Sequence, residues 1–139
     1  MYQSSAAAYK EMEVRSASPG QLVVIVYDHL LVSLRRARIA MEAGNIELRS
    51  TTLAKCRAAV EELLGGLDFA QGGGIAKNLG SLYAFLLTEL VDLGMRPDPK
   101  RLDRLTGIVA ELRDAFAQAA AQASAQASAT GAARAAVAR

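Results

Sequence analysis

The strongest constraint on this fold is a complete helix start that is followed at once by an apolar run, SASPGQLVVIVYD over residues 16–28. Ser18 can cap the first turn through its hydroxyl, and Pro19 falls at the first helical position, where its missing N–H is not needed. Gln21 follows the cap by three residues, the spacing at which its side chain reaches back to the cap. The pattern predicts a helix that begins at Pro19.

The residues after this start are apolar on every side of the helix. The run consists of Leu22, Val23, Val24, Ile25 and Val26. A surface helix of an ordinary bundle needs only one apolar stripe, which recurs every three to four residues. Two interpretations remain open: neighbouring helices bury this helix on all sides, or part of it lines a groove that receives an apolar segment of another chain.

Length, charge and cysteine content exclude several classes of protein. A chain of 139 residues forms one domain that can bury a core without disulfides or metals. Its formal net charge of +2 creates no strong field for nucleic acid or an anionic membrane surface. The single cysteine, Cys56, fits a reducing compartment, and no signal-peptide layout or bilayer-length apolar run occurs. We expect a cytoplasmic protein that binds no nucleic acid and inserts into no membrane.

The apolar residues recur at spacings of three and four, without alternating stretches, so the expected fold class is all-α. The expected helices are a short one over residues 4–14, a second over 19–43, a third from 46 to about 68, a fourth that begins at about Ile75 and ends before Gly94, and a fifth from Pro99. The boundaries come from Gly44 as a left-handed cap, from Asn45 and Asp98 as N-caps, and from Pro99. Such short connections predict an antiparallel up-and-down four-helix bundle with an additional short N-terminal helix.

Three apolar stripes are expected to form the core with the second helix. They consist of Leu53, Cys56, Val60, Leu63 and Leu67 in the third helix; Ile75, Leu79, Leu82, Leu86, Leu90 and Leu93 in the fourth; and Leu102, Leu105, Val109, Leu112 and Phe116 in the fifth. In the fifth helix these residues alternate at spacings of three and four, which is typical of a helix packed nearly antiparallel to its neighbour. The loop predicted between the third and fourth helices contains Gln71 and Gly72–Gly74.

The chain changes in composition after Asp114, where no further acidic residue occurs and Ala, Gln and Ser dominate. Residues 117–139 therefore form a low-complexity C-terminal extension. Because alanine favours helix strongly, we expect the fifth helix to continue to about Ser128 and to fray beyond it. The simplest interpretation is a tolerated tail without a function of its own.

The sequence offers little catalytic or metal-binding chemistry. The only histidine, His29, stands beside Asp28 with no serine or cysteine related to it by spacing. One His and one Cys are too few for a zinc or di-iron site, and Gly72–Gly74 lacks the spaced glycines and the Lys-Ser or Lys-Thr end of a phosphate-binding loop. We expect no enzymatic activity, no cofactor and no metal.

A basic patch is expected on the second helix, where Arg35, Arg36 and Arg38 lie close together in the sequence. Charge runs of this kind are usually solvated faces, and an acidic partner is the alternative interpretation.

A series of different short motifs is spread across residues 1–116. They are Met1-Tyr2, Tyr9, Ala17-Ser18-Pro19, Gln21-Leu22, Tyr27-Asp28, Leu34, Ala37, Ala40, Gly66-Leu67-Asp68, Gly73-Gly74-Ile75-Ala76, Asn78-Leu79, Leu82-Tyr83 and Leu112-Arg113-Asp114-Ala115-Phe116. Their order and approximate spacing resemble those of the FliS family, the flagellin-specific export chaperones. The resemblance covers residues 1–116 as one helical bundle and leaves residues 117–139 outside it.

This resemblance implies a bundle in the bacterial cytosol that binds the disordered C-terminal region of flagellin, prevents premature polymerisation and keeps flagellin competent for flagellar type III secretion. It also implies contacts with the export apparatus and with regulatory proteins. The implied contact surface consists of Leu22, Val23, Val26, Tyr27, Leu30, Asn78, Leu79 and Tyr83. For each of these residues, core packing is the alternative interpretation. Residues 1–17 are expected to act as a lid that carries Tyr2 and Tyr9.

Two other classes of function remain open. A self-associating structural bundle, such as a homodimer, would bury the same apolar surface between copies. A regulatory adaptor would bind another amphipathic partner in place of flagellin. The identity of the bound segment distinguishes these possibilities.

Overall fold

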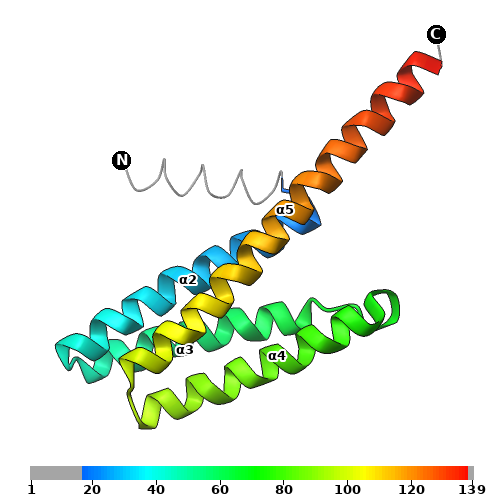
Figure 1. The fold of residues 1–139 in the computed structure, drawn as a ribbon. Helices are drawn as coiled ribbons and strands as arrows, with labels where there is room; N and C mark the ends of the chain where they lie inside the picture. Colours follow the sequence, from blue (N-terminus) through cyan, green and yellow to red (C-terminus); the bar gives the residue numbers. More distant parts are fainter. Residues whose placement is uncertain (1–16, 138–139) are drawn as a thin grey trace, which may run out of the picture. The chain divides into compact units, whose positions relative to one another are not determined.

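A computed structural model describes residues 17–137, which fold into four α-helices: α2 (Pro19–Ala43), α3 (Ile46–Gly65), α4 (Phe69–Met95) and α5 (Pro99–Val137) (Figure 1). The predicted all-α class is confirmed. The helix expected over residues 4–14 lies outside the described residues, as do Tyr2 and Tyr9. The described residues divide into two compact units, one formed by Val26–Leu112 and the other by residues 17–25 with residues 113–137.

The predicted start of α2 is confirmed in its hydrogen bonds. The backbone N–H of Gln21 donates to the Ser18 hydroxyl oxygen at 3.3 Å, and the backbone N–H of Ser18 donates to the side-chain oxygen of Gln21 at 2.8 Å. This reciprocal pair satisfies two donors that a helix end leaves without partners. It holds Pro19 as the first helical residue.

The predicted boundary between α2 and α3 and the predicted start of α5 are also confirmed, whereas α3 ends at Gly65, before the expected end near Asp68. Gly44 ends α2 with a φ of 65°, a left-handed conformation that glycine adopts without steric cost. The side-chain oxygen of Asn45 then accepts from the N–H of Leu48 at 3.0 Å. At α5, Asp98 accepts from the N–H groups of Lys100 and Arg101 at 3.1 and 3.2 Å. Each of these caps offsets part of the cost of a helix end.

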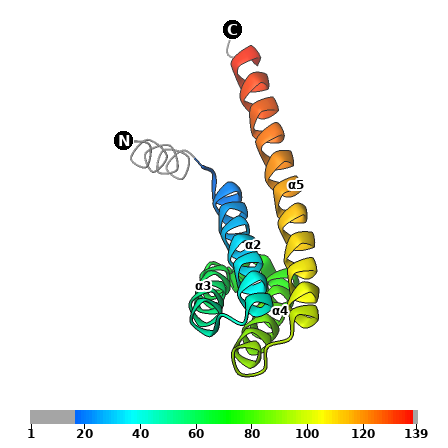
Figure 2. The same ribbon diagram turned by 90° about the vertical axis from the view of Figure 1, so that its left-hand side faces the viewer.

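Within the unit Val26–Leu112, consecutive helical segments run in opposite directions, and α3 packs along α4 (Figures 1 and 2). Side chains from all four segments meet in one core. They include Leu30 and Leu34 of α2, Val60 of α3, Leu86 and Leu90 of α4, and Leu105 and Val109 of α5. The space among these side chains cannot hold a water molecule, so the bundle is closely packed at its centre.

The predicted stripes of α3 and α5 are confirmed at most of their positions. In α3, Leu53, Cys56, Val60 and Leu63 are buried, and in α5, Leu102, Leu105 and Val109 are buried. The positions at the ends of these stripes, Leu67, Leu112 and Phe116, are only half-buried. Apolar residues spaced three and four apart therefore predicted correctly which face of α3 and of α5 is buried in the core.

The predicted stripe of α4 was wrong in its first half. Leu86, Leu90 and Leu93 are buried as expected, whereas Ile75 is 75% exposed. Leu79 and Leu82 are half-buried, and the core positions are taken by Ala76 and Tyr83. A rotation of one residue, about 100° around the helix, separates Ile75 from Ala76. The small Ala76 supplies the buried position there, and the larger Ile75 points away from the core.

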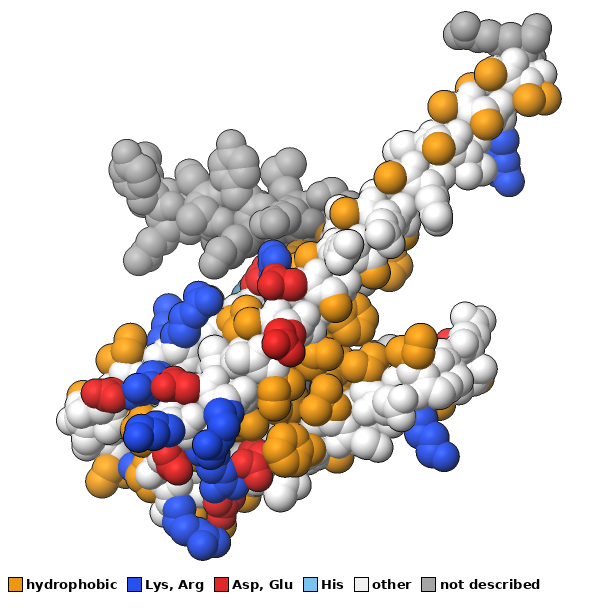
Figure 3. All heavy atoms as spheres, viewed as in Figure 1, with side chains coloured by type: hydrophobic (Ala, Val, Ile, Leu, Met, Phe, Trp, Pro, Cys, Tyr) orange, Lys and Arg blue, Asp and Glu red, His pale blue; other side chains and the backbone are white. Residues whose placement is uncertain are grey.

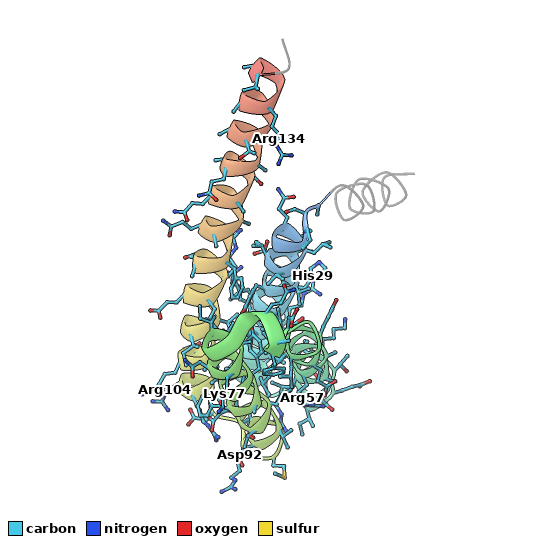
Figure 4. All side chains as sticks on the ribbon, turned by 90° about the vertical axis from the view of Figure 1, so that its right-hand side faces the viewer. His29, Arg57, Lys77, Asp92, Arg104 and Arg134 are labelled. Carbon is cyan, nitrogen blue, oxygen red and sulfur yellow. The ribbon has the colours of Figure 1, made fainter. Side chains whose placement is uncertain are left out.

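The start of α4 also differs from the prediction of a loop over residues 71–74. Asp68 caps a first helical turn, because its carboxylate accepts from the N–H groups of Ala70 and Gln71 at 3.1 and 3.0 Å. Only Gly73 leaves the helical conformation, with φ 53° and ψ −129°. The expected loop is therefore a helical turn followed by a break at one glycine, which is visible as a bend at the start of α4 (Figures 1 and 4).

A charged network joins α4 to α5 beside their connection. The guanidinium of Arg101 donates to Glu89 at 2.5 Å and also to Asp92, and Asp92 forms a second ion pair with Arg96 at 3.2 Å. These hydrogen bonds from Arg101 lower the pKa values of Glu89 and Asp92 below their ordinary range. On the other side of α5, Arg38 of α2 pairs with Asp103 at 2.8 Å.

In the second unit, the first turn of α2 lies close to α5. A Cβ atom placed on Gly20 would lie 3.3 Å from the Cβ atom of Ala120, so two small residues allow the helices to approach closely. The α5 helix continues to Val137, and every residue from 121 to 137 is exposed. The expected helix end near Ser128 was therefore too early, because alanine keeps its helical conformation there without tertiary burial.

Candidate functional site

The candidate residues at the start of α2 are partly accessible. Leu22 is 37% exposed, and Val23 is half-buried. One turn later, Val26 is half-buried as well. The apolar run at the start of α2 therefore keeps accessible surface on more than one residue.

Tyr27 and Tyr83 are brought together from positions 56 residues apart in the sequence. Their side chains are 0% and 1% exposed, and the two hydroxyls share a hydrogen bond that joins α2 to α4. Burial raises the pKa of both phenols above the ordinary value of 10.0. Both hydroxyls therefore stay protonated at neutral pH, so that one donates and the other accepts.

The remaining candidates differ in accessibility. Leu30 is 0% exposed and belongs to the core, Leu79 is half-buried, and Asn78 is exposed on α4. Of the candidates on α4, Asn78 and Leu79 thus reach the surface, whereas Tyr83 does not. Tyr27, Leu30 and Tyr83 occupy the positions that core packing, the alternative interpretation, assigns to them.

Several exposed apolar residues on α4 were missed by the sequence analysis. The most exposed are Phe69 at 56%, Ile75 at 75%, Phe85 at 47%, Val91 at 50% and Met95 at 70%. On the face shown in Figure 3, hydrophobic side chains gather between α4 and the beginning of α5. The available signal was the apolar composition of α4, which exceeds the needs of one buried stripe. Such surplus is typical of a surface that binds another apolar segment.

The described residues contain few groups suited to catalysis. Burial raises the pKa of the Cys56 thiol to about 12, so this thiol is protonated at neutral pH and is a poor nucleophile. His29 is exposed on the side of α2 (Figure 4). Between residues 17 and 137, no three His, Cys, Asp or Glu side chains come together as metal ligands would.

The expected basic patch on α2 is divided between two environments. Arg35 and Arg36 are exposed, whereas Arg38 is half-buried and pairs with Glu42 and Asp103. Arg38 therefore stabilises the bundle, and Arg35 and Arg36 remain solvated.

Comparison with known proteins connects this helical bundle to a family. The family described as flagellar protein FliS matches residues 1–123 of the chain. This protein belongs to the FliS family. Residues 124–137 of α5 lie beyond the matched region.

Curated relatives agree with this membership. The flagellar secretion chaperone FliS of Salmonella typhimurium is 33% identical over 109 residues, which cover 78% of this chain and 81% of that protein. The flagellar secretion chaperone FliS of Vibrio cholerae is 32% identical over 118 residues, covering 82% and 87% of the two chains. That of Bacillus subtilis is 28% identical over 117 residues, covering 84% and 86%.

Among the described helices, none combines the length and the apolar composition that a membrane span requires.

Proposed function

We propose that this member of the FliS family is a flagellar secretion chaperone of the bacterial cytosol. Its client is the disordered C-terminal region of flagellin, which it covers so that flagellin does not polymerise early and remains competent for flagellar type III secretion. The export apparatus and regulatory proteins are its further partners. The protein acts by binding and catalyses no reaction.

The observation that carries this proposal is the exposed apolar surface of α4, on a helix whose opposite face is already buried in the core. A disordered segment loses conformational entropy when it becomes ordered, so its affinity must come from many modest apolar contacts over a long surface. Exposed residues such as Phe85 and half-buried ones such as Leu79 can supply these contacts. The membership of the chain in the FliS family supports the same role.

The proposed contact residues fall into two groups. Leu22, Val23, Val26, Asn78 and Leu79 have accessible side chains, and Asn78 can hydrogen-bond a client amide or carbonyl. Tyr27, Leu30 and Tyr83 are buried and support the accessible ones from within the bundle. Leu30 lies one helical turn after Val26, and Tyr83 lies one turn after Leu79, so each buried residue stabilises a neighbouring contact. We propose that residues 1–17, with Tyr2 and Tyr9, act as a displaceable lid.

Calorimetric titration with the C-terminal segment of flagellin from the same organism tests the proposal. We expect Val26→Asp to weaken binding strongly, because it places a charge among apolar contacts. Arg36→Glu, a charge change at an exposed position of the same helix, is the matched control and should have little effect. Equal losses in the two variants would contradict the assignment of the contact surface. A tight homodimer that ignores the segment would favour self-association instead.

A further inference from the structure

Gly80 of α4 is covered by two apolar side chains, one from the connection between α3 and α4 and one from the first residue of α4. A Cβ atom placed on Gly80 would lie 3.4 Å from two ring carbons of Phe69 and 3.7 Å from a methyl carbon of Leu67. Gly80 itself is half-buried, and the residues one turn away on either side, Ala76 and Tyr83, are buried. The absence of a side chain at Gly80 therefore lets a ring and a leucine methyl lie against the helix backbone, next to the core.

The chain between Leu67 and Gly72, here called the Phe69 turn, contains the last residues before α4 and the first turn of α4. The Asp68 carboxylate caps it, and the N–H of Gly72 donates to the carbonyl of Asp68 at 2.7 Å. It joins the rest of α4 at Gly73, the residue of α4 that leaves the helical conformation, whose φ of 53° and ψ of −129° are open to glycine and strained for other residues. A single permissive residue therefore decides whether the Phe69 turn folds back onto Gly80.

The Phe69 ring is weakly held in this position. It is 56% exposed despite its contact with Gly80, so more than half of the side chain still faces solvent. A ring of this size gains most of its stabilisation from area removed from water, and here that gain is incomplete. A partner side chain that covered the same surface more fully would compete successfully for it.

We propose that the α4 surface at Gly80 is a binding subsite for an aromatic or leucine side chain of the client, and that Phe69 occupies it in the free protein. The present occupants, a phenylalanine ring and a leucine methyl, define the chemistry that fits. Asn78 and Leu79, the accessible contact residues of α4, directly precede Gly80 in the helix. Rotation about Gly73 frees the subsite when the client binds. This inference rests on the proposed chaperone function.

A fluorescence experiment follows the ring directly, because the chain contains no tryptophan. Phe69→Trp introduces a single indole, which is titrated with a tryptophan-free C-terminal segment of flagellin. We expect its emission to shift to longer wavelength and its quenching by iodide to increase as the indole leaves Gly80. Phe85→Trp places the probe on a ring of the same helix that is similarly exposed, at 47%, and serves as the matched control. Its emission should not shift to longer wavelength.

Affinity measurements give the second test. Removal of an internal competitor raises the apparent affinity by the inverse of the fraction of molecules in which the subsite was free, so Phe69→Ala should tighten binding several-fold if Phe69 blocks most molecules. Gly80→Val fills the subsite and should weaken binding, whereas Gly80→Ala, whose methyl would just touch the ring, should change it little. Circular dichroism and the thermal midpoint of each variant show whether the bundle remains folded.

The outcomes separate this inference from the proposed function. If the segment binds but Phe69→Ala weakens binding or leaves it unchanged, Phe69 is not a competitor and the inference is overturned, while the chaperone function stands. Unchanged emission from the Phe69→Trp variant at saturation overturns it in the same way. If no variant and no wild-type protein binds the segment, the proposed function fails and the client assignment of the subsite fails with it.

Discussion

The buried hydrogen bond between Tyr27 and Tyr83 allows a quantitative prediction about what holds α2 against α4. Tyr27→Phe removes one hydroxyl and leaves that of Tyr83, on a side chain 1% exposed, without this partner. A buried polar group that loses its hydrogen bond costs about 1–3 kcal/mol of stability, compared with about 1 kcal/mol for a typical intact bond. We therefore expect Tyr27→Phe to destabilise the protein by about 1–3 kcal/mol.

The double variant Tyr27→Phe/Tyr83→Phe distinguishes this account from a simple loss of packing. Each single variant already loses the hydrogen bond between the two hydroxyls, and the double variant loses it only once, so the double variant should be less destabilised than the sum of the two single variants. Urea unfolding followed by circular dichroism measures all four proteins, and with a slope of about 1–3 kcal/mol per molar urea the predicted loss moves the midpoint by roughly 1 M. Additive losses, or a Tyr27→Phe variant as stable as the wild type, would refute the reasoning.

Three further predictions concern the core, the charged network and the N-terminal segment. Leu90→Ala, a truncation at a side chain 1% exposed, should cost about 2–5 kcal/mol in urea unfolding, and a loss below about 1 kcal/mol would contradict close packing at the centre. The lowered pKa values of Glu89 and Asp92 contribute stability that is present above their ordinary values of 4.5 and 3.8 and is lost as the pH falls through the folded values. Arg101→Gln should therefore lower the thermal midpoint most at neutral pH, with the difference from wild type shrinking in acid; a constant difference would disprove this linkage. Deletion of residues 1–14 should leave the circular dichroism of the bundle unchanged and should not weaken flagellin binding, and a loss of affinity would make this segment part of the binding site.

Local signals predicted the helix ends well because each depends on a few neighbouring residues. Ser18, Asn45 and Asp98 cap helices in the way that their side chains allow, and Gly44 adopts the expected left-handed conformation. The start of α4 was missed because the run of glycines suggested a loop, whereas Asp68 provides a cap that makes a helical turn possible. Glycine content alone did not show that only one residue would leave the helix.

The candidate site was harder to predict because a surplus of apolar residues does not say which of them face solvent. Ile75 fits the spacing of the core stripe, yet Ala76 takes the buried position and Ile75 is exposed. The pairing of Tyr27 with Tyr83 depends on how α2 and α4 pack, which no local pattern specifies. The contact of Phe69 with Gly80 likewise depends on the bend at Gly73.

Recognition of the C-terminal segment of flagellin is the part of the proposed function on which the rest depends. Its most direct test is a calorimetric titration of the full chain with intact monomeric flagellin and with flagellin that lacks this segment, with light scattering to give the mass of each mixture. We expect saturable one-to-one binding with a negative heat-capacity change for intact flagellin and no binding for the truncated form. Equal binding of the two flagellins, or binding of neither, would contradict it.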